Sequence, residues 1–280
     1  MDLPKAKIGI IGYGIVGQAL ANGFKGDEIY FYDKFKDSDF LDEVVKKSEF
    51  IFITLPTPMF DDESGIDLSI IDENISKIAP LAANSDKIVV IKSTVVPGTT
   101  ASYEKKYPKT HFAFNPEFLR EATYMEDFMN PDRTIIGASN DLVSRRLVVL
   151  YKSRFPQIPI FQTDPTSAEM VKYMANAYLS MKVIFANQMQ KLCEALGIKY
   201  EEVKKLVVAD KRIEDTHLDV TTVGGFGGKC FPKDVTALLG FAKEKGVDLS
   251  LMEEVWRINK KIRKVKDWLE IPFATSVKRK

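Results

Sequence analysis

The chain has 280 residues, which corresponds to about two domains at a typical size of roughly 150 residues each. Hydrophobic residues make up 45% of the chain and charged residues 28%, which excludes intrinsically disordered and low-complexity classes. Forty lysines and arginines against 39 acidic residues give a net charge of +1, which argues against a dedicated nucleic-acid-binding protein. No run of 18 apolar residues is present, so no transmembrane helix is expected.

The first half of the chain alternates short apolar runs with amphipathic stretches, a pattern typical of βαβ units and a parallel sheet. We therefore predict the α/β class, with a Rossmann-like, doubly wound and mostly parallel sheet. The predicted strands are Lys7–Ile11, Ile29–Tyr32, Phe50–Thr54, Ile88–Ile91, His111–Phe114 and Thr134–Ile136. The predicted helices of this half are Ile15–Phe24, Leu68–Ala79 and Asp141–Tyr151.

One long helix is predicted from Thr166 to about Leu196, because this stretch contains no glycine or proline. Thr166-Ser167-Ala168-Glu169 matches a capping box at its start, and Gly197 is a suitable stop. Further helices are predicted over residues 200–208, 235–245 and 251–269. The predicted organisation is a Rossmann-like sheet domain over residues 1–164, an all-helical domain over residues 165–270 and a tail over residues 271–280.

Three features of the sequence bear on the cellular compartment and the partners of the protein. They are the cysteines, the N-terminus and the lysine-rich segments. Cys193 falls in a helical pattern and Cys230 in a glycine-rich segment, so no disulfide scaffold is expected. The N-terminus lacks the length and the cleavage site of a signal peptide, and we expect a cytoplasmic protein. The basic segments 260–266 and 278–280 are interpreted as solvated faces, with a nucleic-acid contact as the minor alternative. We predict no nucleic-acid partner and no membrane partner.

Residues 12–17 form a G-x-G-x-x-G motif between a predicted strand and a predicted helix. The first glycine permits a tight turn, the second lets the backbone approach a pyrophosphate, and the third allows close helix–strand packing. Asp33 ends the next strand, where an acid suits the ribose hydroxyls of NAD and repels the 2′-phosphate of NADP. NAD is the predicted cofactor, while Lys34 and Lys36 leave NADP open. The residues expected to contact the cofactor are Gly12, Gly14, Ile15, Val16, Gly17 and Asp33.

A second motif joins the glycine-rich residues 224–228 to Lys229-Cys230-Phe231-Pro232-Lys233-Asp234. Four glycines in five residues allow the backbone to approach a ligand closely. Pro232 suits the first turn of a helix, which would place Cys230 at a helix N-terminus near two lysines, where its thiolate is favoured. A structural cysteine beside a loop, followed by an ordinary first-turn acid at Asp234, is the alternative interpretation.

Polar residues also line one face of the predicted long helix. Glu169, Lys172 and Asn176 are spaced i, i+3 and i+7, so they share that face. A lysine and a side-chain amide one turn apart are suited to hold an oxyanion, although a plain polar stripe has the same spacing.

Three polar segments follow predicted strands, at residues 55–58, 92–100 and 115–121. In a doubly wound sheet ligands bind outside the carboxyl ends of the strands, so these segments are binding candidates. Taken singly, each is also consistent with an ordinary turn. His111 and His217 have no partners at metal-ligand spacing, so no metal is expected.

Together these motifs resemble the UDP-glucose/GDP-mannose dehydrogenase family, and among its members they look most like the UDP-glucose 6-dehydrogenases. The matches run in family order across nearly the whole chain, and the last block is not shared by other Rossmann dehydrogenases. The matching segments are 12–17, 92–100, 115–121, 131–133, Glu169-Met170-Val171-Lys172 with Asn176, 210–213 and 225–234.

The resemblance implies oxidation of the C6 hydroxyl of a nucleotide hexose to a carboxylate with two NAD, and the conversion it favours is that of UDP-glucose to UDP-glucuronate. It implies that Cys230 captures the aldehyde from the first hydride transfer as a thiohemiacetal, and that the second transfer gives a thioester. Water then releases the acid. The other catalytic residues it implies are Lys172 and Asn176 for the oxyanions, Glu117 for proton transfer in thioester hydrolysis, and Asp234 and Thr94 for positioning water or relaying a proton.

Binding contacts also follow from the resemblance. Glu121 matches a position that contacts NAD, and Arg212 matches one that reaches the substrate of the other subunit in a homodimer built on the long helix. The further cofactor contacts expected are Pro56, Thr57, Thr94 and Lys233. The expected cradle of the nucleotide sugar comprises Phe118, Leu119, Arg120, Lys172, Asn176, Arg212, Gly225, Phe226, Gly227 and Gly228.

Three features depart from the family pattern. The chain between Asp33 and Phe50 is shorter than usual, so a helix of the first domain is expected to be trimmed. Lys229 replaces the small residue common before the cysteine. Only about twenty residues follow the segment 255–259, where the family has a third, nucleotide-binding domain, so we expect that domain to be lacking.

Two other functions stay open at this point. A β-hydroxyacid dehydrogenase of the 6-phosphogluconate type would share the dinucleotide domain, the long helix and the Lys-x-x-x-Asn spacing, but it would not need the segment around Cys230. A catalytically weak NAD-binding subunit that needs a partner chain is the other alternative.

Overall fold

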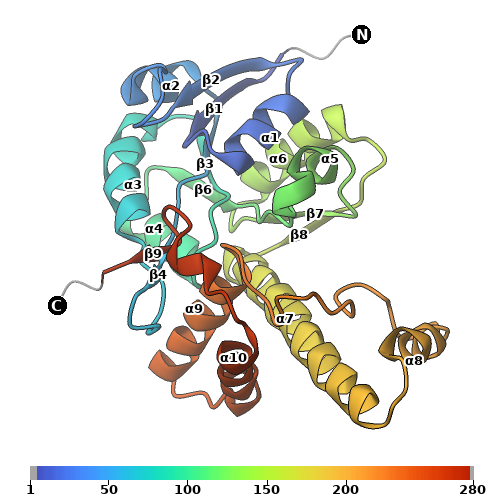
Figure 1. Ribbon diagram of the computed structural model, residues 1–280. Helices are drawn as coiled ribbons and strands as arrows, with labels where there is room; N and C mark the ends of the chain where they lie inside the picture. Colours follow the sequence, from blue (N-terminus) through green and yellow to red (C-terminus); the bar gives the residue numbers. More distant parts are fainter. Residues whose placement is uncertain (1–4, 278–280) are drawn as a thin grey trace. The chain divides into compact units, whose positions relative to one another are not determined.

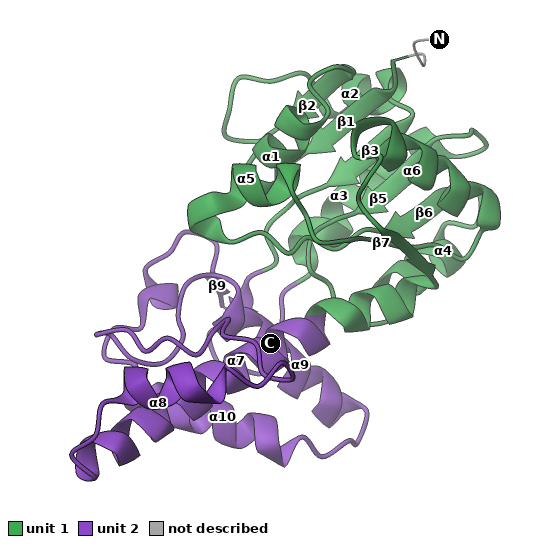
Figure 2. Ribbon diagram, turned by 90° about the vertical axis from the view of Figure 1, so that its right-hand side faces the viewer, with its two compact units in different colours: residues 1–57, 68–172 green, residues 58–67, 173–280 purple. Residues whose placement is uncertain are grey.

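The computed structural model describes residues 5–277, whose elements follow one another along the chain as Figure 1 shows. The chain divides into two compact units (Figure 2). Unit 1 comprises residues 1–57 and 68–172, and unit 2 comprises residues 58–67 and 173–280. The basic segment Lys278-Arg279-Lys280 lies outside the described residues.

Unit 1 is built on a seven-stranded sheet with the order β2-β1-β3-β5-β6-β7-β8. Neighbouring strands pair in parallel except β6 and β7, which run antiparallel, so the predicted fold class is confirmed. The last strand, β8, was not predicted because it lies at the sheet edge with Phe161 and Gln162 exposed, and so lacks a buried apolar run. The strands are β1 Lys7–Ile11, β2 Glu28–Tyr32, β3 Phe50–Ile53, β5 Ile88–Ile91, β6 His111–Phe114, β7 Thr134–Gly137 and β8 Ile160–Thr163.

Helices cover both faces of this sheet, because successive strand residues point to opposite sides. Ile51 and Ile53 belong to one apolar core, together with Ile75 of α3, whereas Phe50 and Phe52 belong to the other. Two short helices were not predicted, α4 with eight residues and α5 with six. The seven-residue α2 lies between Asp33 and Phe50, where a trimmed helix was expected. The helices of unit 1 are α1 Ile15–Gly23, α2 Leu41–Lys47, α3 Ser69–Ala82, α4 Thr99–Lys106, α5 Tyr124–Met129 and α6 Asp141–Arg154, with the 3₁₀ turn η1 Glu121–Thr123.

The long helix α7 spans Pro165–Ala195 and is within one residue of its predicted bounds. The predicted capping box is wrong. The backbone N–H of Ser167 donates to Asp164 Oδ1 at 2.9 Å, whereas the carboxylate of Glu169 accepts hydrogen bonds from Gly98 and Thr100. Glu169 is fully buried in unit 1, so its side chain serves the start of α4 and not the start of its own helix.

The division between the units falls inside α7, eight residues after the predicted domain boundary at 164. The physical reason is that the first turns of α7 pack in unit 1, where Ala168 is part of the apolar core. Residues 58–67 also differ from the prediction, because they belong to unit 2: Met59 lies in its core, and Glu63 Oε2 accepts a hydrogen bond from Trp256 Nε1 at 2.9 Å.

Unit 2 is mainly helical around a core that includes Met59, Trp256 and Trp268. It departs from the predicted all-helical composition through one parallel pair of two-residue strands, which takes up part of the predicted tail. The helix predicted to reach residue 269 ends at Ile262, where Arg263 adopts an extended backbone. The elements are α8 Tyr200–Val207, α9 Phe231–Glu244, α10 Ser250–Ile262, the 3₁₀ turn η2 Asp267–Leu269, β4 Met59–Phe60 and β9 Thr275–Ser276. Across residues 5–277, no helix is both long and apolar enough to span a lipid bilayer.

Gly137 shows how closely α7 begins against β7. A Cβ at Gly137 would lie 2.6 Å from Ala168 Cβ and 2.9 Å from Pro165 Cα. We expect Gly137→Ala to lower the free energy of unfolding by about 2 kcal/mol, because backbone atoms of α7 would have to move. Gly14→Ala is the matched control, since a Cβ there meets nothing within 4 Å. Urea denaturation without cofactor measures both, and equal stability of the two variants would contradict the expectation.

Candidate active site

Four polar turns meet at one edge of the sheet in unit 1, because parallel strands β1, β3, β5 and β6 all end there. Side-chain hydrogen bonds tie each turn to the next. Thr54 Oγ1 donates to the carbonyl of Gly12 at 2.5 Å, and Ser93 Oγ donates to the carbonyl of Leu55 at 2.7 Å. Lys92 Nζ donates to Asn115 Oδ1 at 2.8 Å. The predicted binding segments of unit 1 are therefore neighbours, with Thr57 and Thr94 buried among them.

The glycine motif adopts the geometry that a bound pyrophosphate needs. Gly12 has a φ of 94°, in the left-handed region, and a Cβ there would lie 2.8 Å from the carbonyl oxygen of Thr54. Gly17 packs so closely that its Cβ would lie 2.3 Å from the carbonyl oxygen of Gly12. Gly14 precedes α1 and borders open space, so the N–H groups at the start of α1, from Ile15 and Val16, are placed for a phosphate.

Asp33 lies beside this motif, immediately after β2. Its Oδ2 accepts a hydrogen bond from the N–H of Tyr13 at 2.7 Å, and its Oδ1 accepts one from the N–H of Phe35 at 2.9 Å. The ammonium of Lys36 is held by the carbonyl of Tyr13 at 2.6 Å. The carboxylate is thus fixed at the glycine loop, where it suits a ribose with free hydroxyls. These residues fit a dinucleotide without a 2′-phosphate.

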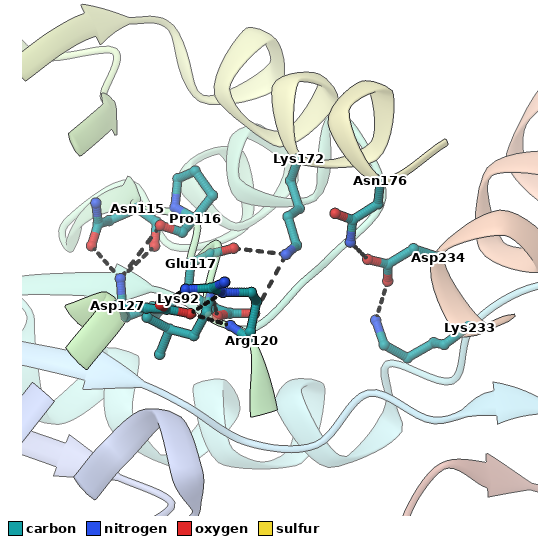
Figure 3. Close-up of polar contacts among 11 residues, drawn as sticks. Lys92, Asn115, Pro116, Glu117, Arg120, Asp127, Lys172, Asn176, Lys233 and Asp234 are labelled. Atoms are coloured by element: carbon teal, nitrogen blue, oxygen red, sulfur yellow. Dashed lines mark hydrogen bonds and ion pairs between the residues drawn. The ribbon is translucent and has the colours of Figure 1, made fainter. Parts of the chain in front are cut away.

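Lys172 and Glu117 form the polar centre of unit 1 (Figure 3). Lys172 Nζ donates to the carbonyl oxygen of Glu117 at 2.7 Å and lies 3.4 Å from its Oε1. Both side chains are largely buried, at 4% and 10% exposure. The carboxylate is fixed further by the N–H of Leu119, which donates to Oε2 at 2.8 Å. A buried ammonium beside a buried carboxylate is a suitable pair for stabilising an oxyanion and moving a proton.

The residues after Glu117 turn toward the surface. Phe118 is half-buried, with the Arg133 guanidinium 4.6 Å from its ring centre. Arg120 is tied to Asp127 by two hydrogen bonds of 2.6 Å and 3.1 Å (Figure 3). Leu119 packs against the second apolar core of unit 1, and Glu121 is exposed at the start of η1. In this arrangement Arg120 already has an acidic partner.

In unit 2 two predicted catalytic side chains, those of Cys230 and Asp234, lie at the start of α9. Cys230 is exposed and occupies the N-cap position of this helix. Asp234, one turn further, is 2% exposed; its Oδ2 accepts a hydrogen bond from Asn176 Nδ2 at 2.5 Å, and its Oδ1 accepts one from Lys233 Nζ (Figure 3). Asp234 is therefore more than an ordinary first-turn acid. The contact with Asn176 joins two segments that the sequence treated separately.

The glycine-rich loop before Cys230 is held by side chains at the end of α10 and beyond it. Asn259, which is fully buried, accepts a hydrogen bond from the N–H of Phe226 at 2.8 Å and donates to its carbonyl at 3.0 Å. Asp267 Oδ2 accepts one from the N–H of Gly228 at 2.9 Å, and Asn187 Oδ1 accepts one from Gly225 at 3.1 Å. These hydrogen bonds fix the shape of the loop.

This packing changes the interpretation of the four glycines. A Cβ at Gly224 would lie 2.8 Å from Ile262 Cγ2, one at Gly225 would lie 2.4 Å from Asn259 Oδ1, and one at Gly227 would lie 2.3 Å from Asp267 Oδ1. These three glycines are required by the close approach of the chain's own segment 259–267. Of the four, Gly228 alone borders open space, so it is the glycine best suited to a ligand.

Arg212 lies in the turn after α8, with 88% of its side chain exposed and its guanidinium paired with Asp210 at 2.5 Å. Lys92 and Asn115 lie in predicted binding segments, but sequence reasoning assigned neither of them an individual role, and it assigned none to Asn259 or Asp267, although each directly holds a site segment. Lys92 carried a signal, since a lysine directly after a buried strand has to find partners. Among residues 5–277, no group of three or more His, Cys, Asp or Glu side chains is placed to hold a metal ion.

Comparison with known proteins then identifies the family. Residues 31–154 match the model for the NAD binding domain of the UDP-glucose/GDP-mannose dehydrogenase family, and residues 166–261 match the model for its central domain. The chain belongs to the UDP-glucose/GDP-mannose dehydrogenase family. The predicted resemblance and the predicted NAD cofactor are thereby confirmed.

Individual relatives agree with this assignment. UDP-glucose 6-dehydrogenase of Rickettsia bellii is 38% identical over 237 residues, which cover 82% of this chain and 53% of the relative. UDP-glucose 6-dehydrogenase of Haloferax volcanii is 33% identical over 247 residues, covering 83% and 56%. A solved UDP-glucose dehydrogenase from Pyrobaculum islandicum superposes with a TM-score of 0.83 at 28% identity, covering 92% of this chain and 68% of that one. The chain spans about half the length of the curated relatives that it matches.

The amide of Asn259 gives a test of the glycine-rich loop. We expect Asn259→Ala to lower the free energy of unfolding by about 2–4 kcal/mol, because it leaves a buried N–H and a buried C=O of Phe226 unpaired. Asn187→Ala removes one 3.1 Å contact to the same loop and should cost only about 1 kcal/mol. Chemical denaturation ranks the two variants; a larger loss for Asn187→Ala would contradict the structural account.

Proposed function

We propose that this chain carries out the NAD-dependent oxidation of the C6 hydroxyl of a nucleotide hexose to a carboxylate, with UDP-glucose as the substrate. The observation that carries the proposal is Cys230, exposed at the N-cap of α9, one turn before the buried pair of Asp234 and Asn176. A thiol at a helix N-terminus has a stabilised thiolate, which is the nucleophile that a two-step oxidation needs. The curated relatives named above support the choice of substrate.

The reaction is proposed to pass through a covalent intermediate on Cys230. Bound NAD supplies the hydride acceptor for each of two oxidations. The C6 alcohol loses a hydride and a proton to give an aldehyde, and the thiolate of Cys230 adds to its carbonyl carbon to give a thiohemiacetal. Loss of a second hydride, to a second NAD, converts the thiohemiacetal into a thioester. Addition of water to the thioester carbonyl then releases the carboxylate and regenerates the thiol.

Other side chains are proposed to handle charge and protons. The ammonium of Lys172 and the amide of Asn176 stabilise the oxyanions; Asn176 has a second N–H besides the one that Asp234 accepts. Glu117 moves a proton during thioester hydrolysis, while Asp234 and Thr94 position the water. The contacts proposed for the cofactor are Pro56, Thr57, Thr94, Glu121 and Lys233, and those proposed for the nucleotide sugar are Phe118, Leu119, Arg120, Arg212 and residues 225–228. The cytoplasmic location stays a prediction.

Cysteine substitution tests the covalent step. With UDP-glucose, the unmodified chain is expected to form two NADH for each sugar oxidised, followed by absorbance at 340 nm and by chromatography of the acid. Cys230→Ser should form less than about 1% of the acid, because a hydroxyl is a far weaker nucleophile than a thiolate. Cys193→Ser is the control, since Cys193 is buried in α7 and should leave turnover unchanged.

Three outcomes would contradict the proposal. NAD reduction that survives Cys230→Ala would favour a β-hydroxyacid dehydrogenase instead. Tight NAD binding without turnover of any UDP- or GDP-hexose would favour a subunit that needs a partner chain. One NADH for each sugar would exclude the four-electron oxidation.

We propose further that two copies of the chain associate through α7. Four large apolar side chains of this helix are more than half exposed, and their spacing of four, seven and seven residues keeps them on one face. They are Met174, Tyr178, Phe185 and Leu192. A second copy is the proposed occupant, because the family resemblance implies a homodimer on this helix and the stripe is long enough to pair with itself about a twofold axis.

A charge placed in this stripe tests the association. Phe185→Arg should shift the sedimenting mass from the dimer to the monomer, because a buried guanidinium would face apolar side chains of the other copy. Leu206→Arg is the matched control, since Leu206 is also an exposed apolar residue, on α8, at 76% exposure. Analytical ultracentrifugation measures both; a monomeric unmodified chain, or equal dissociation by both variants, would contradict the proposal.

A further inference from the structure

A second buried lysine, Lys92, contacts the turn of residues 115–117, which also binds Lys172. Lys92 directly follows β5 and is 4% exposed. Its ammonium donates to Asn115 Oδ1 at 2.8 Å and to the carbonyl oxygens of Asn115 and Pro116 at 3.4 Å each (Figure 3). The ring centre of Phe128 lies 5.7 Å from the nitrogen. The charge is therefore compensated chiefly by backbone and amide oxygens and by a ring.

The amide of Asn115 is itself held from three sides, so it is a fixed anchor for Lys92. Its Oδ1 also accepts a hydrogen bond from the hydroxyl of Tyr151 at 2.5 Å, and its Nδ2 donates to the carbonyl of Ile135 at 2.7 Å. Its backbone N–H continues the sheet by donating to the carbonyl of Ile91 at 2.9 Å. Because Asn115 is held in place, a displacement of Lys92 would shift the backbone of the turn at residues 115–117.

Two ammonium groups divide three consecutive carbonyl oxygens between them. Lys92 takes those of Asn115 and Pro116, and Lys172 takes that of Glu117 at 2.7 Å. The Glu117 carboxylate is placed by the same turn, since its Oε2 accepts the N–H of Leu119 and its Oε1 faces Lys172. The carbonyl and the carboxylate of Glu117 therefore point toward Lys172 only while the turn keeps its shape, and Lys92 holds that turn.

Placing an ammonium at this buried position is unfavourable in free energy. Burying it costs several kcal/mol of hydration that three oxygen contacts only partly return, whereas an apolar side chain of similar length would cost nothing of the kind. Burial lowers the pKa of Lys92 to about 8; the carboxylate of Glu117 opposes this shift, and the positive charge of Lys172 adds to it. The stability of the fold does not account for a cation here, but the shape of the turn does.

We propose that Lys92 is a positioning residue for the oxidation: its buried ammonium fixes the turn of residues 115–117, so that the carbonyl and carboxylate of Glu117 are presented to Lys172. The inference rests on the proposed function for its effect on turnover. The effect of Lys92 on the conformation of residues 115–117 can be measured without any catalytic activity.

Lys87 supplies a matched control at the other end of the same strand. It precedes β5, and its ammonium also donates to two backbone carbonyls, those of Lys46 at 2.8 Å and Ser48 at 2.6 Å, far along the strand from the polar turns. Lys92→Met and Lys87→Met therefore remove the same group from the same strand. Each leaves backbone oxygens to be satisfied by other donors.

The first experiment compares steady-state kinetics of the two variants with UDP-glucose and NAD. Lys92→Met should lower kcat about 10- to 100-fold, the size expected when a catalytic pair is misplaced by a fraction of an ångström to 1 Å, while the Kd of NAD stays within about twofold. Lys87→Met should keep kcat within about twofold. A wild-type kcat in Lys92→Met, or equal losses in both variants, would overturn the proposal.

The pH dependence separates positioning from a purely structural role. As pH rises through about 8, Lys92 loses its proton, so activity should fall. Its folded pKa is below the unfolded value of 10.5, so between these values the unfolded chain binds more protons and stability should rise with pH. Activity and stability thus move in opposite directions, and Lys92→Met should lack both trends. Constant wild-type activity from pH 7 to about 9.5 would overturn the proposal even where the variant fails to fold.

Amide hydrogen exchange tests the turn without turnover. Lys92→Met should speed exchange of the Leu119 amide at least about tenfold relative to wild type, because the turn that directs its acceptor is loosened. Lys87→Met should leave that exchange unchanged. Absence of turnover in the unmodified chain would count against the proposed function alone, whereas unchanged exchange in Lys92→Met would overturn the role of Lys92.

Discussion

The parallel pairing of β1, β3, β5 and β6 is the constraint on which the chemistry of unit 1 depends. Parallel strands end at one edge, so turns that are separated by up to about 100 residues in sequence become neighbours there. Short hydrogen bonds from Thr54, Ser93 and Lys92 then join these turns in series. The glycine motif and the Glu117 turn are consequently two ends of one hydrogen-bonded edge.

The helix α7 has polar side chains that are bound within each of the two units. Glu169 is bound by the start of α4, Lys172 by the carbonyl of Glu117, and Asn176 by Asp234 at the start of α9. Three polar residues within two turns of one helix are thus each fixed by a different segment. The i, i+3, i+7 spacing places these three side chains on one face of the helix. This explains why the i, i+3, i+7 spacing was informative.

Much of the fold could be predicted because its signals are local. Buried strands such as Ile88–Ile91 are short apolar runs, and α7 is a long stretch without glycine or proline, so both were found within a residue. The edge strand β8 and the short helix α4 were missed, because β8 is exposed in its middle and the buried face of α4 consists of two threonines and a tyrosine in place of an apolar run. The role of residues 58–67 in unit 2 was missed for another reason: Met59 and Glu63 find their partners almost 200 residues away.

The site was predictable in its residue types but not in its contacts. Cys230 and Lys172 were identified from motifs, whereas the clamp of Asn259 and Asp267 on the glycine-rich loop has no local signature. For that loop the sequence indicated ligand approach at all four glycines; the structure assigns three of them to the chain's own segment 259–267. A glycine is required where another atom lies too close for a Cβ. The sequence does not say whether that atom belongs to a ligand or to the protein.

Two buried charges in unit 1, those of Lys92 and Glu169, are compensated more by the backbone than by opposite charges. Lys92 rests on two carbonyl oxygens and an amide oxygen, while Glu169 rests on the N–H groups of Gly98 and Thr100 and on the Thr100 hydroxyl. Burial raises the pKa of Glu169 to about 6 and lowers that of Lys92, so in both cases desolvation outweighs the attraction of the partners. An ion held by backbone dipoles is sensitive to direction, because a carbonyl that rotates away loses its attraction, whereas a counter-ion would not. Such an arrangement stabilises the fold little, yet it makes the shape of the turns at the sheet edge strict.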